Sequence, residues 1–227
     1  MPLKNPELTK FTTQSPILAS YSASDLITGI SYEVFYGYTH KETTTLAYGI
    51  DKETLIAEEF TTTGTQSSDT FTKTMDLDFD SAELNVARTI GGTMKINFMT
   101  GAGSTATSNT ANQTYVIFKL RKWDGSTETE IANVQSSTVS QGASNRMDYD
   151  VRNVEMTVPQ THYQAGEQIR ITCEVWARRS AANSGTIYFA HDPQDKVDTT
   201  SFPEGITAGR RPESSQLKFL IPFRIDL

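Results

Sequence analysis

The chain has 227 residues, a formal net charge of −7 and 37% hydrophobic residues. That length suits one large β-type domain or two small ones, and such a chain buries roughly 70% of the surface that it exposes when unfolded. The negative charge argues against a nucleic-acid binder, because such proteins neutralise phosphates with Lys and Arg. The pairs Arg178-Arg179 and Arg210-Arg211 are too sparse for a basic stripe, and we expect them to be surface charges.

Two further features bear on where the protein is made. Cys173 is the single cysteine, so an internal disulfide framework is excluded. The first residues, MPLKNPELTKFTTQ, contain no apolar signal-peptide core, and no 18 apolar residues run together. We therefore expect a product of a cytoplasm, with no export signal and no membrane partner.

Residues 1–29 contain three prolines and little periodicity, which predicts an extended N-terminal arm with at most a helical turn near residues 24–27. Strand patterns begin directly afterwards. In SYEVFYGYT, residues 31–39, three tyrosines and Val34 share one face, while Glu33 and Phe35 share the other. The presence of Val34 favours burial of the tyrosine face in the core. A sugar-stacking platform or a protein interface, together with Trp123 and Trp176, is the alternative.

The middle of the chain continues to alternate. Residues 74–80 and 93–99 place Met75, Leu77 and Phe79, then Met94, Ile96 and Phe98, on inward faces. A low-complexity loop over residues 100–113 follows. Residues 115–123 and 128–134 predict a hairpin with a type I′ turn at Asp124-Gly125. Its inward face holds Val116, Phe118 and Leu120.

Four more strands are expected in the last third of the chain, at residues 151–158, 168–177, 186–190 and 217–227. The last one alternates most clearly, with Leu217, Phe219, Ile221 and Phe223 on one face. Pro222 lies on the other face and cannot donate a backbone hydrogen bond, which predicts an unpaired sheet edge there.

These patterns predict an all-β protein, an antiparallel jelly-roll-like β-sandwich, with residues 30–227 as a single domain behind the arm at 1–29. An immunoglobulin-like sandwich is the alternative, although its Cys–Trp–Cys hallmark is absent.

The stretch GTIYFAHDPQDKVDTT, residues 185–200, resembles an active site most closely, since His191, Asp192, Asp195 and Asp198 follow an apolar run. A catalytic triad needs a Ser or Cys nucleophile near the histidine. In the alternating pattern of its strand, Cys173 falls on the face expected to point into the core, so it offers no nucleophile. Zinc needs three or four His, Cys or carboxylate ligands, usually from more than one segment, and the other histidines, His40 and His162, are expected at the ends of different strands. We therefore expect a strand that ends at His191 and a turn at Asp192-Pro193.

Acidic clusters offer a second kind of candidate. Asp76, Asp78 and Asp80 alternate on one strand, but Ser81 and Ala87 occupy the positions where an EF-hand requires Gly and Glu. A solvated face is expected, with a surface calcium site as the alternative. The pairs Glu58-Glu59 and Glu128/Glu130 are candidates for glycoside hydrolysis in name alone. The expected set of catalytic, cofactor-binding and metal residues is therefore empty.

The stretches AGEQIRITCEVWA, FAHDP and LKFLIPFRIDL, within residues 30–227, resemble jelly-roll structural proteins from virions of tailed bacteriophages and related archaeal viruses. The resemblance implies a non-enzymatic virion structural protein, such as a capsid decoration, head-fibre or tail-accessory protein. Its implied partners are capsid or tail subunits and further copies of itself, and its implied location is the virion. A carbohydrate-binding, lectin-like or receptor-binding sandwich is the alternative function.

Overall fold

The computed structural model describes residues 29–103, 112–141, 146–179, 185–195, 208–209 and 214–224. The predicted arm, apart from Gly29, lies outside these ranges, as do most of the predicted loop at 100–113 and the last residues of the final strand. The described ranges form strands and connections, and they contain no helix long and apolar enough to cross a membrane.

Thirteen strands are present in the described ranges. They are β1 (Ile30–Glu42), β2 (Thr45–Asp51), β3 (Thr61–Gln66), β4 (Thr72–Ser81), β5 (Arg88–Gly103), β6 (Asn112–Trp123), β7 (Glu128–Gln135), β8 (Val139–Gln141), β9 (Arg146–Tyr163), β10 (Gln168–Arg179), β11 (Gly185–Ala190), β12 (Ala208–Gly209) and β13 (Lys218–Arg224).

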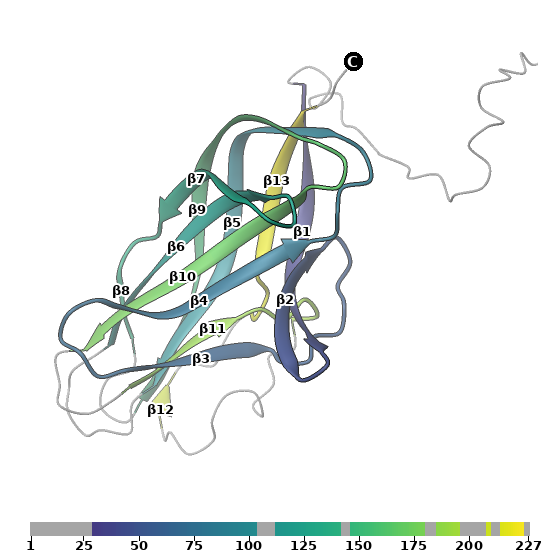
Figure 1. Ribbon diagram of the computed structural model, residues 1–227. Coiled ribbons are helices and arrows are strands. Elements are labelled where there is room, and N and C mark those ends of the chain that lie inside the picture. The colour runs from purple at the N-terminus through teal and green to yellow at the C-terminus, as the bar shows by residue number, and fades with distance from the viewer. Residues whose placement is uncertain are drawn as a thin grey trace, which may run out of the picture.

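The strands form one hydrogen-bonded sheet in the order β12-β9-β5-β13-β1-β2-β4-β10-β6-β7, with β11 joining β3 to β5 and β8 paired to β6. This sheet folds over on itself, so that β4, β10 and β6 lie in front of β5, β13 and β9 (Figure 1). Two pairings, β2 with β4 and β12 with β9, are parallel. The predicted all-β sandwich is confirmed, and its sheet is mixed rather than purely antiparallel. The single-domain boundary at residue 30 stays a prediction.

The core lies between the two halves of the folded sheet. The ring of Phe98 on β5 meets that of Phe118 on β6 edge-on at 4.8 Å, and Phe79 on β4 lies 6.4 Å from Phe219 on β13. The predicted inward positions of β4, β5, β6 and β13 are confirmed as buried, and residues of β10 are buried together with them. These are Met75, Leu77, Phe79, Met94, Ile96, Phe98, Val116, Phe118, Leu120, Ile169, Ile171, Cys173, Val175, Leu217, Phe219, Ile221 and Phe223.

Pro222 does not mark a sheet edge, so that prediction is wrong. Strand β13 lies between β1 and β5 and pairs with both of them. The ladder with β5 shifts its register between Leu220 and Phe223, and Pro222 lies inside that irregularity. A proline lacks the N–H that a regular ladder needs, and a bulge is the other place in a sheet that accepts it.

The predicted two-residue type I′ turn at Asp124-Gly125 is also wrong. Strands β6 and β7 do pair as a hairpin, but four residues, 124–127, connect them. Gly125 has a positive φ of 89°, whereas Asp124 does not. The Asp124 carboxylate instead accepts hydrogen bonds from the backbone N–H groups of Ser126 and Thr127, which stabilises the longer loop.

Candidate functional site

A polar pocket opens where the β1–β2 hairpin meets β4 and the start of β10. Its volume is about 540 Å³, within the range of small-molecule sites. The parallel pairing of Gly49 with Asp80 brings β2 beside β4 and creates this junction. The lining is supplied by Tyr38, His40, Ala47, Tyr48, Gly49, Asp51, Asp78, Asp80, Ser81, Ala82 and Gln168.

An aromatic ring forms one wall of this pocket. Tyr38 lies directly opposite Gly49 in the β1–β2 ladder. A Cβ atom at Gly49 would lie 2.7 Å from the Tyr38 Cζ atom, so the ring rests on the glycine backbone. The His40 ring lies 5.6 Å from the same ring. Burial and then the charge of Asp51 raise the pKa of the Tyr38 hydroxyl. The wall is therefore a neutral phenol beside a carboxylate.

The position of Tyr38 overturns the expected burial of the tyrosine face. Phe35 is buried on the other face of β1, while Tyr32 is 44% exposed and Val34 is 37% exposed. Tyr38 is half-buried at the pocket, and Trp123 and Trp176 are half-buried as well. The face that carries the tyrosines is thus the outer face of the sheet.

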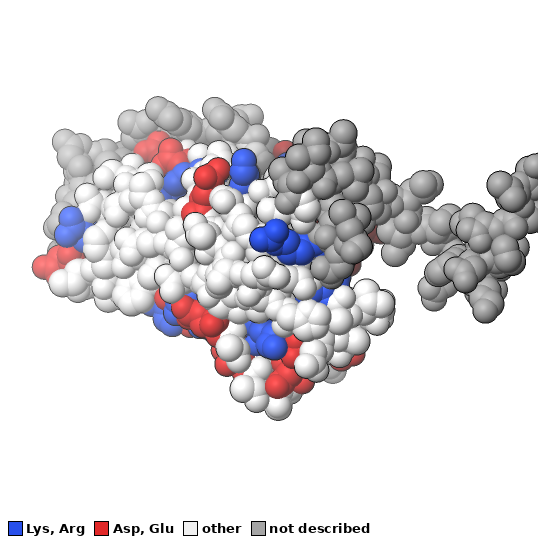
Figure 2. All heavy atoms as spheres, turned by 90° about the horizontal axis from the view of Figure 1, so that it is seen from above, with Lys and Arg blue, Asp and Glu red and all other residues white. Residues whose placement is uncertain are grey.

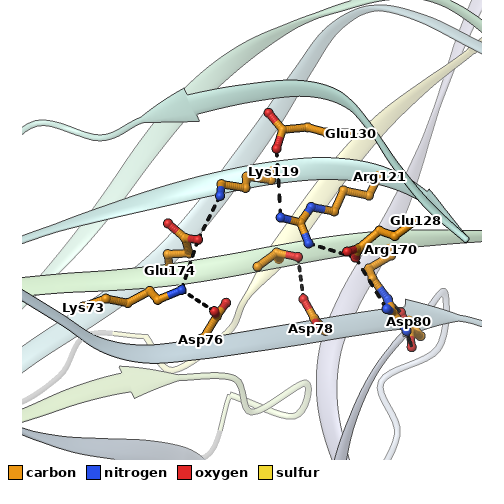
Figure 3. A network of polar contacts seen from close by, with 11 residues as sticks. Lys73, Asp76, Asp78, Asp80, Lys119, Arg121, Glu128, Glu130, Arg170 and Glu174 are labelled. Carbon is orange, nitrogen blue, oxygen red and sulfur yellow. Dashed lines mark hydrogen bonds and ion pairs between the residues drawn. The ribbon is translucent and has the colours of Figure 1, made fainter.

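The acidic strand face that the sequence predicts is an ion-pair ladder rather than a plainly solvated face (Figure 3). Asp80 binds Arg170 through both of its carboxylate oxygens, at 2.6 and 2.7 Å. Asp78 accepts a hydrogen bond from the Thr172 hydroxyl at 2.5 Å, and Asp76 pairs with Lys73. Each of the three carboxylates therefore has a protein partner across or along the strands.

The same network extends over β6 and β7. Glu174 pairs with Lys119 at 2.8 Å, and Arg121 pairs with Glu128 at 2.8 Å. Burial alone would raise the pKa of Glu174, but hydrogen bonds from Lys119 and Trp176 outweigh it and lower that pKa. Acidic and basic side chains are likewise close together on the face shown in Figure 2. The pair Glu128/Glu130 belongs to this network, because Glu130 lies 3.9 Å from Arg121.

Two pocket carboxylates, Asp51 and Asp78, are hydrogen-bonded to uncharged groups. Asp51 accepts a hydrogen bond from the backbone N–H of Glu53 at 2.8 Å, and Asp78 has its bond from Thr172. Among the described residues, neither carboxylate makes an ion pair. The pocket therefore holds two negative charges that Lys and Arg do not neutralise by direct contact. Asp51 and Gly49 were not among the candidate residues predicted from the sequence. A glycine opposite an aromatic residue in a predicted hairpin would have indicated a site of this kind.

The His191 cluster is a buried corner of the fold. His191 is fully buried, its Nε2 atom lies 2.9 Å from the Thr62 hydroxyl, and the Tyr48 ring meets it edge-on at 5.7 Å. Burial lowers the pKa of its imidazole to about 4. Strand β11 ends at Ala190, just before His191, as the sequence predicts.

The residues after His191 tie β11 to the segment before β13. Asp192 is also fully buried, and its carboxylate accepts the backbone N–H of Gln194 at 3.0 Å, which forms the expected turn. The Asp195 carboxylate accepts the backbone N–H of Ser215 at 2.7 Å. Asp198 lies outside the described residues. These bonds give the acidic groups structural partners within the corner.

The other candidates lie apart from the pocket, His40 excepted. Cys173 is in the core, and burial raises the pKa of its thiol well above the usual value. His162 is exposed and lies 3.2 Å from the Thr89 hydroxyl, while Glu58 pairs with Lys41 at 3.6 Å. Within the described ranges, no three His, Cys, Asp or Glu side chains are grouped to hold a metal ion. The empty set of site residues stays a prediction.

No protein-family model matches the chain, and no curated protein matches it in sequence. Among solved structures, an α-amino acid ester hydrolase matches 85% of this chain with a TM-score of 0.54 and 8% identity. An aminopeptidase from a marine sediment Thaumarchaeota archaeon matches 86% with a TM-score of 0.52 and 8% identity. This chain covers 36% and 37% of those two chains, about a third of their length. At such identity the likeness shows the fold alone.

The prediction of a non-enzymatic virion structural protein is wrong. Two solved structures that match this fold with TM-scores above 0.5 are, by their names, an α-amino acid ester hydrolase and an aminopeptidase. A structure of the infectious bursal disease virus Gx strain also matches, at 8% identity, over 82% of this chain and 40% of that chain. Its TM-score of 0.23 carries no argument for a virion role. The expected partners, homo-oligomer and location in the virion stay untested.

Proposed function

We propose that the chain is a ligand-binding β-sandwich of a hydrolase-type protein, and that its pocket binds molecules with a protonated amino group. The observation that carries this proposal is the Tyr38 ring on Gly49, placed in one pocket with Asp51 and Asp78. An ammonium group is attracted both to the face of an aromatic ring and to carboxylates. The pocket offers the two kinds of group together.

The comparison with hydrolases supports the class of ligand. One of the solved structures is, by its name, a hydrolase of α-amino acid esters, which carry an amino group. Because this chain covers about a third of that protein, the proposal concerns ligand binding and assigns no catalytic residue.

The test compares a ligand that carries a protonated amino group with a ligand whose amino group is acetylated and therefore uncharged. Isothermal titration of the whole chain with phenylalanine amide should show binding, and N-acetylphenylalanine amide should bind about tenfold more weakly or worse. Equal affinities for the two ligands would overturn the proposal.

Three variants locate the binding. Asp51→Asn keeps an oxygen for the Glu53 N–H but removes the charge, so affinity for the amide should fall about tenfold. Gly49→Ala places a methyl group where the Tyr38 ring lies and should abolish binding without changing any charge. Asp76→Asn removes a carboxylate that lies on the same face of β4 as Asp78 but outside the pocket lining. This variant should therefore bind like the parent protein. Equal losses in Asp76→Asn and Asp51→Asn would show that the pocket is not the site.

A further inference from the structure

Arg179 and Asn112, at the end of the β6–β10 ladder, are a buried polar pair whose side chains lack hydrogen-bond partners in the described part of the chain. They form the last residue pair of the β6–β10 ladder, and they are 1% and 0% exposed. The Nε, Nη1 and Nη2 atoms of Arg179 and both amide atoms of Asn112 have no hydrogen-bond partner among the described residues. Arg179 is therefore not the surface charge that its sequence context predicts.

The two side chains converge on one place. A Cβ atom at Gly185, the first residue of β11, would lie 2.5 Å from Asn112 Oδ1 and 2.9 Å from Arg179 Nη1. The guanidinium and the amide thus lie against the same stretch of backbone. This place is separate from the pocket, because Gln168 at the pocket and Arg179 stand at opposite ends of β10.

The polar side chains next to this pair have hydrogen-bond partners, apart from the Nε atom of Arg152. Gln141 lies on the other side of Asn112 in the sheet, and its amide bonds to the Thr100 carbonyl, the Thr114 hydroxyl and the Asp150 carboxylate. Arg152, another buried arginine, donates to the Ser137 carbonyl and the Thr100 hydroxyl. Arg179 differs from Arg152 in that no charge among the described residues acts to support its protonated form. Burial alone acts on the Arg179 pKa and lowers it, whereas Asp150 acts on that of Arg152.

A buried guanidinium without a counter-charge is unfavourable because it loses hydration without gaining an ionic partner, so such groups are normally paired. The planar fork of an arginine matches the two oxygens of a carboxylate or a phosphate. We propose that Arg179 and Asn112 form a binding site for one small oxyanion, a carboxylate or phosphate group. Arg179 donates to it from the guanidinium, and Asn112 donates from its amide nitrogen.

The test is the melting temperature in sodium acetate, sodium phosphate and sodium chloride at equal ionic strength. Acetate, phosphate or both should raise the Tm of the parent protein relative to chloride, by about 3 to 6 °C at ten times the dissociation constant. A response to acetate alone identifies a carboxylate site, and a response to phosphate alone identifies a phosphate site. Arg179→Met should lose the response. Arg178→Gln, a change at the neighbouring exposed arginine, should keep it.

A second variant tests the charge directly. Asn112→Asp places a carboxylate beside Arg179, so its Tm in chloride should exceed that of the parent, and the response to added anions should disappear. The proposal is overturned if neither anion shifts the parent protein, if Arg179→Met responds equally, or if Asn112→Asp melts below the parent in chloride.

Discussion

His191 should make the stability of the protein depend steeply on pH, and His191→Gln should remove that dependence. The side chain is fully buried, with Tyr48 and Phe79 rings around it and one hydrogen-bonded partner, the Thr62 hydroxyl. A glutamine can reach the Thr62 hydroxyl with its terminal amide but does not titrate.

The size of the effect follows from the pKa. Burial lowers the pKa of His191 from its usual 6.5 to about 4 in the folded protein. Between these two pH values, His191 binds a proton in the unfolded chain but stays neutral in the folded protein, so the free energy of unfolding falls as the pH falls. Each pKa unit corresponds to about 1.4 kcal/mol, which gives a loss of about 3 kcal/mol between pH 6.5 and pH 4. Above pH 6.5 the stabilisation is fully present.

Urea unfolding at a series of pH values measures this loss. The free energy of unfolding of the parent protein should fall by about 3 kcal/mol more than that of His191→Gln over this range. His162→Gln, a change at an exposed histidine, keeps His191 and should keep the full loss. If the parent and His191→Gln lost stability in parallel, the account of a neutral buried imidazole would be refuted.

Two further substitutions test the core and the ion-pair ladder. Phe98→Ala should lower the free energy of unfolding by about 3 to 5 kcal/mol in urea titrations, because a fully buried ring 4.8 Å from Phe118 is lost. A loss below 1 kcal/mol would contradict the packing of the two sheet halves. Arg170→Gln should cost about 1 to 2 kcal/mol, since it removes the paired bonds to Asp80 and the contact with the Trp123 ring at 4.3 Å. That cost should shrink in high salt, and a salt-independent cost would argue against an ionic origin.

Alternation in the sequence predicted the strands and most of the core, because a period of two assigns residues to two faces. It did not say which face of β1 is inward. The three tyrosines outnumber Phe35, yet Phe35 is buried, and Leu217 and Phe79 fill the space beside Gly37 on that inner face. The tyrosines are therefore outside because neighbouring strands already occupy the interior. Such long-range packing is invisible in a local pattern.

Only some residues of the candidate site could be predicted from the sequence. The local sequence drew attention to His191 and to the acidic face at residues 76–80, and partners distant in the sequence determine both environments. Thr62 contacts His191 across 129 positions, and Arg170 reaches Asp80 across 90. The pocket depends on the parallel pairing of β2 with β4. Turn residues in the sequence predict antiparallel hairpins, and they do not predict a parallel pairing of this kind. Of the pocket's lining residues, Asp78 and Asp80 had been considered as ligands for calcium, and His40 had been considered as a ligand for zinc.

The place of β13 has a consequence for synthesis on the ribosome. Residues 218–224 are translated after all the other described strands, yet they pair with both β1 and β5. Until they emerge, β1 and β5 each present a row of unpaired backbone groups where β13 will later lie. Closure of this side of the sandwich therefore waits until residues 218–224 have been translated, and contacts between distant segments are slow to form. A nascent or prematurely terminated chain would expose the unpaired edges of β1 and β5 at the same time. Such a chain is prone to aggregate, and we expect chaperones to bind it.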